Sequence, residues 1–194
     1  MQIDGVPFDK WIDINHSNSR WPDKVGSCWI SDECINWLVE VMGDLWRKTY
    51  LEIGTFDGIA ISLLAEKYPE KHFIAVDAFK TGENTAGGHM GYFIENNKHL
   101  DNVQLFIGES RDLLPKLWNK VFPDVIFIDA DHSYEAVVRD MTLACMLAKP
   151  WTIVAMHDYG GMDGVTKAID KFCASNGFEL KKAADIVYIV KGEK

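Results

Sequence analysis

The stretch that decides the fold is E-I-G-T-F-D-G, residues 52–58. A short β-prone segment at 49–53 leads into it, an apolar segment with helical character follows at 59–67, and the next apolar run ends at Asp77. Glycine lets the backbone turn tightly and approach a ligand, because it has no Cβ. An acid at the tip of the second strand can accept hydrogen bonds from both hydroxyls of a ribose. The order of strand, glycine turn, helix, strand and acid therefore predicts a site for a nucleotide-type cofactor.

From residue 49 onward the chain alternates between strand and helix patterns. Strands are expected at 49–53, 72–77, 103–107, 124–129 and 151–156, and helices near 58–67, 90–99, 110–118, 133–147 and 163–175. Most strand runs are continuously apolar, which indicates burial on both faces of a parallel sheet. The last two strands, 178–182 and 186–190, have a link between them that is too short for a parallel crossover, so they should pair antiparallel.

The composition excludes several classes of protein. The chain has 194 residues, of which 47% are hydrophobic and 25% charged, and this suits one soluble globular unit. Membrane spans are not expected, because no apolar run approaches the ~20 residues that a spanning helix needs. The N-terminus lacks the basic start and apolar stretch of a signal peptide, and the four cysteines are scattered, so we expect a cytoplasmic protein with reduced thiols. The net charge of −9 argues against a nucleic-acid partner and favours a small-molecule substrate.

Tryptophan is concentrated in the N-terminal part of the chain. Five of the seven tryptophans precede the glycine stretch: Trp11, Trp21, Trp29, Trp37 and Trp46. Residues 1–45 are therefore interpreted as a collar or lid that packs on a core domain at 46–194. As a collar, the segment would pack its indoles on the sheet, and this is favoured for Trp37 and Trp46. As a lid, it would offer aromatic faces to a ring of the substrate, and it could also form a homodimer contact.

Polar residues follow the expected strands at the points where those strands end. In an open α/β sheet, ligands bind beyond the carboxyl ends of the strands. The residues at those positions are Glu52 to Gly54, Asp77, Gly108 to Ser110, Asp129 to His132, and His157 with Asp158. We expect these residues to gather at one edge of the sheet and to form the site. The other histidines, at 16, 72, 89 and 99, are expected to be structural.

The glycine spacing, E-x-G-x-x-x-G, lacks the third glycine of a dinucleotide fingerprint. It resembles motif I of the class I S-adenosylmethionine (SAM) methyltransferases, and Asp77 resembles their ribose-binding acid. The resemblance implies a Rossmann-like, seven-stranded, mostly parallel sheet with helices on both faces and a C-terminal antiparallel hairpin. It also implies a set of cofactor-binding residues: Glu52, Gly54, Thr55, Gly58, Asp77, Gly108, Glu109, Ser110 and Asp129. Ser110 would contact the adenine, cap the following helix, or do both.

Two further motifs, D-x-x-H-x-Y at 129–134 and H-D at 157–158, are similar to those of the small metal-dependent O-methyltransferases, which include catechol and sugar O-methyltransferases. This resemblance implies that Asp129, His157 and Asp158 hold a divalent metal, magnesium or manganese. Asp129 and His132 would be the catalytic residues, with His132 as the general base. The nitrogen of His157 departs from the all-oxygen set that magnesium prefers. His157 would therefore bind a softer metal, or orient Asp158, or belong to a site without metal.

Three alternatives remain open at this point. The first is a SAM methyltransferase of the same fold that works without metal. The second is a nucleotide-binding oxidoreductase, against which the missing third glycine argues. The third is a small-molecule binding module without catalytic activity.

Overall fold

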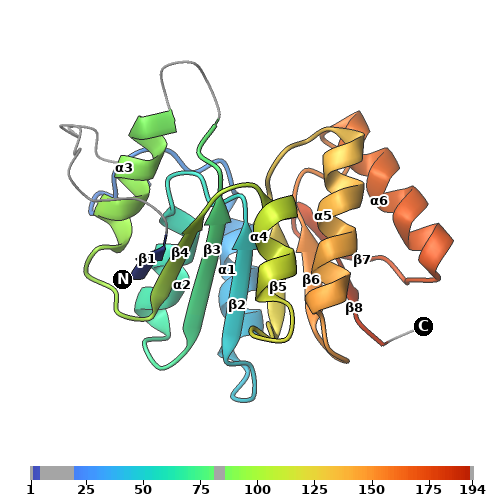
Figure 1. Ribbon diagram of the computed structural model, residues 1–194, viewed down its shortest axis with the longest axis horizontal. Coiled ribbons are helices and arrows are strands. Elements are labelled where there is room, and N and C mark those ends of the chain that lie inside the picture. The colour runs from blue at the N-terminus through green and yellow to red at the C-terminus, as the bar shows by residue number, and fades with distance from the viewer. Residues whose placement is uncertain (1, 5–19, 81–85, 193–194) are drawn as a thin grey trace.

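A computed structural model gives the fold and describes residues 2–4, 20–80 and 86–192 (Figure 1). Its strands are β1 (Gln2–Asp4), β2 (Thr49–Ile53), β3 (His72–Asp77), β4 (Val103–Ile107), β5 (Val125–Ile128), β6 (Ile153–Met156), β7 (Lys181–Ala183) and β8 (Ile186–Val190). Its helices are α1 (Asp32–Gly43), α2 (Ile59–Lys67), α3 (Ala86–Asn97), α4 (Ser110–Leu117), α5 (Tyr134–Leu147) and α6 (Asp163–Asn176). None of the helices in these residues is long and apolar enough to cross a membrane.

All strands belong to one sheet, in the order β1-β4-β3-β2-β5-β6-β8-β7. The pairs are parallel from β1 to β6, whereas β8 runs antiparallel to both β6 and β7. The predicted α/β fold, with a mostly parallel sheet and a terminal antiparallel hairpin, is confirmed, but the sheet has eight strands where seven were expected. The prediction missed β1, a parallel edge strand beside β4, because three residues with one central isoleucine carry too little pattern to be recognised.

Helices cover both faces of the sheet, as the alternation of strands and helices predicted. Neighbouring residues of β2 face opposite layers: Tyr50 packs in the core that contains residues of α1, α2 and α3, and Leu51 packs in the core of α4, α5 and α6. The strand order reverses at β2, because β3 lies on one side of it and β5 on the other. A reversal of this kind opens a crevice above the carboxyl ends of the two central strands, and ligands bind there in open α/β sheets.

The N-terminal tryptophans are divided between packing and exposure. Trp37 and Trp21 pack against the core of α1, α2 and α3, as expected of a collar. Trp46 does not, since 54% of it is exposed, so the collar prediction was wrong for this residue. It lies in the turn between α1 and β2, where the chain has already left the core-facing side of the helix. Trp29 is 81% exposed, and Trp11 lies outside the described residues.

Candidate functional site

A cavity of about 840 Å³ lies above the carboxyl ends of the central strands. It is lined by the loops that follow β2, β3, β4, β5 and β6, and by residues 27–30 of the N-terminal segment. The predicted site residues all line it: Glu52, Gly54, Thr55, Gly58, Asp77, Gly108, Glu109, Ser110, Asp129, His132, His157 and Asp158. The structure therefore brings together the groups that the strand-end rule placed at one edge of the sheet.

The glycine loop after β2 needs both of its glycines. Gly54 has a φ of +82°, and a Cβ built on it would lie 2.1 Å from the backbone oxygen of Asp129. Gly58 has a φ of +69°, and a Cβ there would lie 2.3 Å from the ring of Phe93. The left-handed backbone and the close neighbours both exclude larger residues. The two glycines thus let the loop pack tightly between β5 and α3 while its outer side faces the cavity.

Asp77, the predicted ribose acid, also holds the glycine loop in place. Its Oδ2 accepts hydrogen bonds from the backbone amides of Thr55 and Phe56, at 2.8 and 2.9 Å, and its Oδ1 accepts one from the amide of Phe79 at 2.6 Å. A carboxylate oxygen has two lone pairs, so a ligand hydroxyl can still bind. The side chain therefore links the tip of β3 to the loop that would surround a cofactor.

Glu52 is almost completely buried beneath the same loop. Its two carboxyl oxygens accept hydrogen bonds from the Tyr50 hydroxyl and the Thr55 hydroxyl, both at 2.7 Å. Burial raises the pKa of Glu52 to about 8, because the charged form loses its hydration and the two hydroxyls only partly compensate. The carboxyl group is therefore mostly protonated near neutral pH, and it supports the loop from below.

The loop after β4 contributes two polar contacts to the cavity wall. The Ser110 hydroxyl donates to Oδ1 of the buried Asp140 at 2.6 Å, and the Lys80 ammonium pairs with Glu109 at 2.7 Å. Ser110 is the first residue of α4, and the N-cap is Glu109. The serine hydroxyl thus binds α5 and does not cap the helix. Asp140 was not predicted, because it lies on the following helix, α5, far from any strand end.

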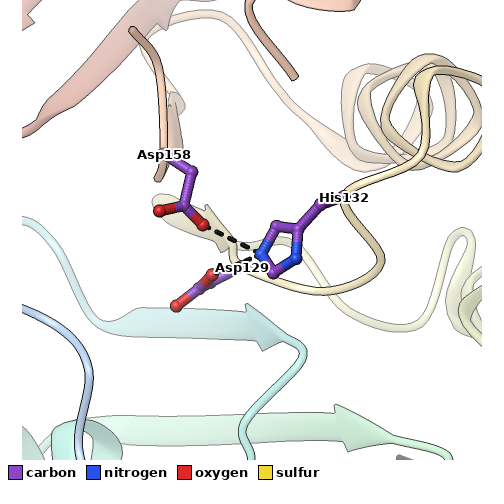
Figure 2. Close-up of side chains that lie close together, drawn as sticks. All are labelled: Asp129, His132 and Asp158. Carbon is purple, nitrogen blue, oxygen red and sulfur yellow. Dashed lines mark ion pairs between the residues drawn. The ribbon is translucent and has the colours of Figure 1, made fainter. Parts of the chain in front are cut away.

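The acids after β5 and β6 face each other, with a histidine between them (Figure 2). His132 Nε2 lies 2.8 Å from Asp158 Oδ2 and 3.7 Å from Asp129 Oδ1. One ligand atom from each of these three residues falls within 4.8 Å of the others, which is a geometry that can hold a metal ion. The histidine in this cluster is His132, which the motif comparison had assigned as a base, whereas His157 had been assigned as a ligand.

His157 lies behind the cluster and is 8% exposed. Its Nδ1 is 3.5 Å from Asp129 Oδ1 and 3.3 Å from Asp158 Oδ1, and it is buried without a hydrogen-bond partner in the described chain. Its Nε2 lies 3.5 Å from Asp185 Oδ2, in the turn between β7 and β8. The sequence did not point to Asp185, because a polar residue in a hairpin turn is ordinary.

The charges of this cluster stabilise one another. Burial opposes ionisation of Asp129, but the nearby imidazole rings of His132 and His157 outweigh it and hold the Asp129 pKa below its ordinary value. The carboxylates of Asp129 and Asp158 raise the pKa of His132, although partial burial opposes them. Burial alone would lower the pKa of His157, but Asp129, Asp158 and Asp185 together raise it to about 9. Two adjacent carboxylates are thus stabilised by positive charge, which a bound cation could also supply.

A family model described as a methyltransferase domain matches residues 51–159, which is more than half of the chain. The chain belongs to this methyltransferase-domain family. The matched range begins in β2 and ends just beyond Asp158, so it contains the residues predicted for the cofactor, the metal and the base.

Similar proteins extend this comparison. An uncharacterised protein of Acanthamoeba polyphaga mimivirus, R132, is 31% identical over 133 residues, which are 63% of this chain and 58% of the relative. The chain therefore spans less than two thirds of that relative's length.

Solved structures with a similar fold include the O-methyltransferase TomG from Streptomyces achromogenes, in complex with SAM. It has a TM-score of 0.63 and 21% identity, and the match covers 89% of this chain and 84% of the TomG chain. CalS11, a TDP-rhamnose 3'-O-methyltransferase of calicheamicin biosynthesis, has a TM-score of 0.62 and 15% identity, covering 82% and 77%. At these identities the two structures establish a shared fold.

Proposed function

We propose that the chain transfers the methyl group of SAM to an oxygen of a small hydroxylated molecule. The observation that carries this proposal is that the glycine loop and the acid–histidine cluster face the same cavity. Membership in the methyltransferase-domain family supports the donor. The two structural relatives named above act as O-methyltransferases, which favours oxygen as the acceptor atom.

In this proposal the cofactor lies across the switch point of the sheet. The methionine part lies against the glycine loop, Asp77 binds the ribose hydroxyls, and the adenine lies toward Gly108 and Ser110. Gly54 and the Asp129 backbone are in close contact, so the residues that would hold the cofactor adjoin the acid–histidine cluster. The cluster would hold a substrate oxygen in the same cavity as the cofactor, and such positioning is a large part of catalysis in a two-substrate reaction.

The reaction forms one bond and breaks another. A lone pair of the substrate oxygen forms the new bond to the methyl carbon as the carbon–sulfur bond breaks, and that bond's electron pair stays on sulfur in S-adenosylhomocysteine. The hydroxyl proton passes to His132 in its neutral form. With 43% of its side chain exposed, this residue is accessible to a substrate, whereas His157 is buried.

The residues behind the substrate position fit a divalent cation. Asp129, Asp158 and Nδ1 of His157 would hold it, since that nitrogen is buried, lacks a hydrogen bond and lies close to both carboxylates. Two carboxylates with an imidazole suit manganese, iron, cobalt or nickel better than magnesium. A cation bound there would lower the pKa of a substrate hydroxyl. Turnover that survives complete chelation would favour the metal-independent version of the same chemistry.

The proposed partners and location follow from charge and thiol state. The acids of the cluster favour a neutral or cationic small molecule as the substrate. They would repel the phosphates of a nucleic acid. All four cysteines are free, which is the state expected in the cytoplasm.

Titration calorimetry with S-adenosylhomocysteine and with NAD tests the proposal. We expect the first ligand to bind and the second to give no heat. Asp77→Ala should weaken the binding of S-adenosylhomocysteine strongly, because it removes both the ribose contact and the support of the glycine loop. Binding of NAD, or an unchanged affinity in the variant, would contradict the cofactor assignment.

A further inference from the structure

We infer that Asp57 and His89 form the subsite that binds the amino-acid end of the cofactor, with His89 as the residue in contact with it. This inference rests on the proposed function and adds a recognition element to it. His89 was expected to be structural from the sequence, yet its side chain and that of Asp57 both line the cavity beside the glycine loop.

The pair is built from three segments that are distant in the sequence. His89 Nδ1, on α3, lies 2.5 Å from Asp57 Oδ1 in the glycine loop. The other oxygen of Asp57, Oδ2, accepts the backbone amide of Ser27 at 2.6 Å. Both oxygens of Asp57 thus contact protein groups, and the residue is only 1% exposed. Its position is therefore fixed. A carboxylate in this role orients a histidine ring and selects which of its nitrogens faces a ligand.

The ring of His89 is held from a second side as well. The Phe56 ring lies against it, with a centroid separation of 4.0 Å. Phe56 adopts a φ of +51°, a backbone conformation that is unusual for a bulky residue. Such a conformation is kept only where the surrounding structure over-determines it, often at a binding site. With Nδ1 on Asp57, the remaining nitrogen, Nε2, has no hydrogen-bond partner among the described residues and is left to a ligand.

Other polar side chains near the loop are already engaged. The Thr55 hydroxyl donates to Glu52. Asp77 accepts three backbone amides and is assigned to the ribose in the proposed function. The cations at the cavity wall are paired as well: Lys80 with Glu109, and Arg139 with Asp140 at 3.2 Å. His89 thus offers an unoccupied ring nitrogen to a ligand beside the glycine loop.

The amino-acid end of SAM offers groups that match a histidine nitrogen. A doubly protonated ring would donate Nε2–H to the α-carboxylate, and a ring with its proton on Nδ1 would accept a hydrogen bond from the α-ammonium. Both groups are on the same end of the cofactor, and charge-assisted hydrogen bonds of this kind are the strong ones. Within the glycine loop, the Thr55 hydroxyl hydrogen is used by Glu52, and both oxygens of Asp57 accept protein groups.

Two ligands that differ only at this end test the inference by calorimetry. S-adenosylhomocysteine carries the amino-acid end, and 5′-methylthioadenosine lacks it. In His89→Ala we expect the affinity for S-adenosylhomocysteine to fall about 10- to 100-fold, the usual cost of a charge-assisted hydrogen bond. The affinity for 5′-methylthioadenosine should change by less than about twofold, and this also shows that the variant is folded.

Two further variants complete the test. His99→Ala is the matched control, because His99 also pairs with a carboxylate, Glu66 at 2.9 Å, but on the surface away from the cavity. It should leave both affinities unchanged. His89→Gln keeps an amide that can donate or accept, so it should regain part of the affinity for S-adenosylhomocysteine.

The outcomes separate this inference from the proposed function. If His89→Ala weakens both ligands equally, or neither, His89 has a structural role and the inference is wrong while the cofactor assignment stands. If the unaltered protein binds neither ligand, the proposed function itself fails.

Discussion

The backbone oxygen of Asp129 packs so closely on Gly54 that a Cβ built on Gly54 would lie only 2.1 Å from it. The residue at the end of β5 that carries the proposed catalytic acid is thus packed directly on the turn that would admit the cofactor. The glycine loop and the start of the loop after β5 are therefore held together by backbone contact. This relationship gives the first prediction.

Gly54→Ala should destabilise the fold and displace the cofactor loop from β5. We expect a loss of about 2–4 kcal/mol in the free energy of unfolding, because a backbone clash adds to the left-handed strain. The matched control is Gly160→Ala, whose φ of +84° is similar but whose Cβ would meet nothing within 4 Å. That variant should lose only about 1 kcal/mol. Equal losses in denaturant titrations of the two variants would show that the contact with Asp129 is unimportant.

Glu52 predicts how stability changes with pH. Its pKa is about 8 in the folded chain and 4.5 ordinarily, so the folded protein keeps a proton that the unfolded chain has released. The stabilisation is complete below pH 4.5 and is lost as the pH rises through 8. The side chain in Glu52→Gln cannot ionise. Between pH 5 and pH 9 the free energy of unfolding should therefore decrease in the unaltered protein by a few kcal/mol more than in this variant.

The control for this measurement is Glu40→Gln, which changes an exposed glutamate on α1. His157 also has a raised pKa and contributes a loss of the same sign in alkaline solution. Because that contribution is common to all three proteins, the difference between them isolates Glu52. Parallel pH profiles for Glu52→Gln and the unaltered protein would contradict the prediction.

Asp185 should help to set the charge of His157. Its Oδ2 lies 3.5 Å from His157 Nε2, and it is one of the three acids that raise the pKa of that ring to about 9. In the metal-free protein, Asp185→Asn should therefore lower the pKa of His157 while leaving that of His132 nearly unchanged. Titration of the two imidazole rings by NMR measures both values at once. A His157 pKa that stays at its original value would mean that Asp129 and Asp158 alone hold its proton.

The fold could be predicted from the sequence where the signal was local and long. The run Val125–Ile128 is apolar at every position, so it predicts a strand buried on both faces, and the structure has β5 there. The edge strand β1 has no comparable pattern. Trp46 was expected in a collar because its distance from the helix was small, but the helix had ended three residues earlier, at Gly43.

The candidate site could be predicted only as far as strand ends determine it. Asp129 and Asp158 follow neighbouring strands, so the topology alone brings them together. Asp185 and His89 could not be found in this way. Each meets its partner through a contact between segments far apart in the sequence, from a hairpin turn in one case and from the side of a helix in the other. No local spacing encodes such contacts.

The roles of the two histidines near the acids can be separated by measuring metal binding and turnover independently. His157→Ala removes the buried nitrogen that lies 3.5 and 3.3 Å from the two carboxylates, so it should weaken Mn²⁺ binding at least about tenfold. His132→Ala removes the accessible ring, so it should keep most of the Mn²⁺ affinity and lower turnover by about 10²–10⁴-fold, the usual contribution of a general base. Titration of Mn²⁺ by electron paramagnetic resonance needs no substrate and gives the Mn²⁺ affinity directly.

The assignment of His132 as the metal ligand would give a different result. Its ligand atom also lies within 4.8 Å of those of Asp129 and Asp158. If His132→Ala abolishes Mn²⁺ binding and His157→Ala does not, His132 is the ligand, and the proton of the substrate must leave by another route.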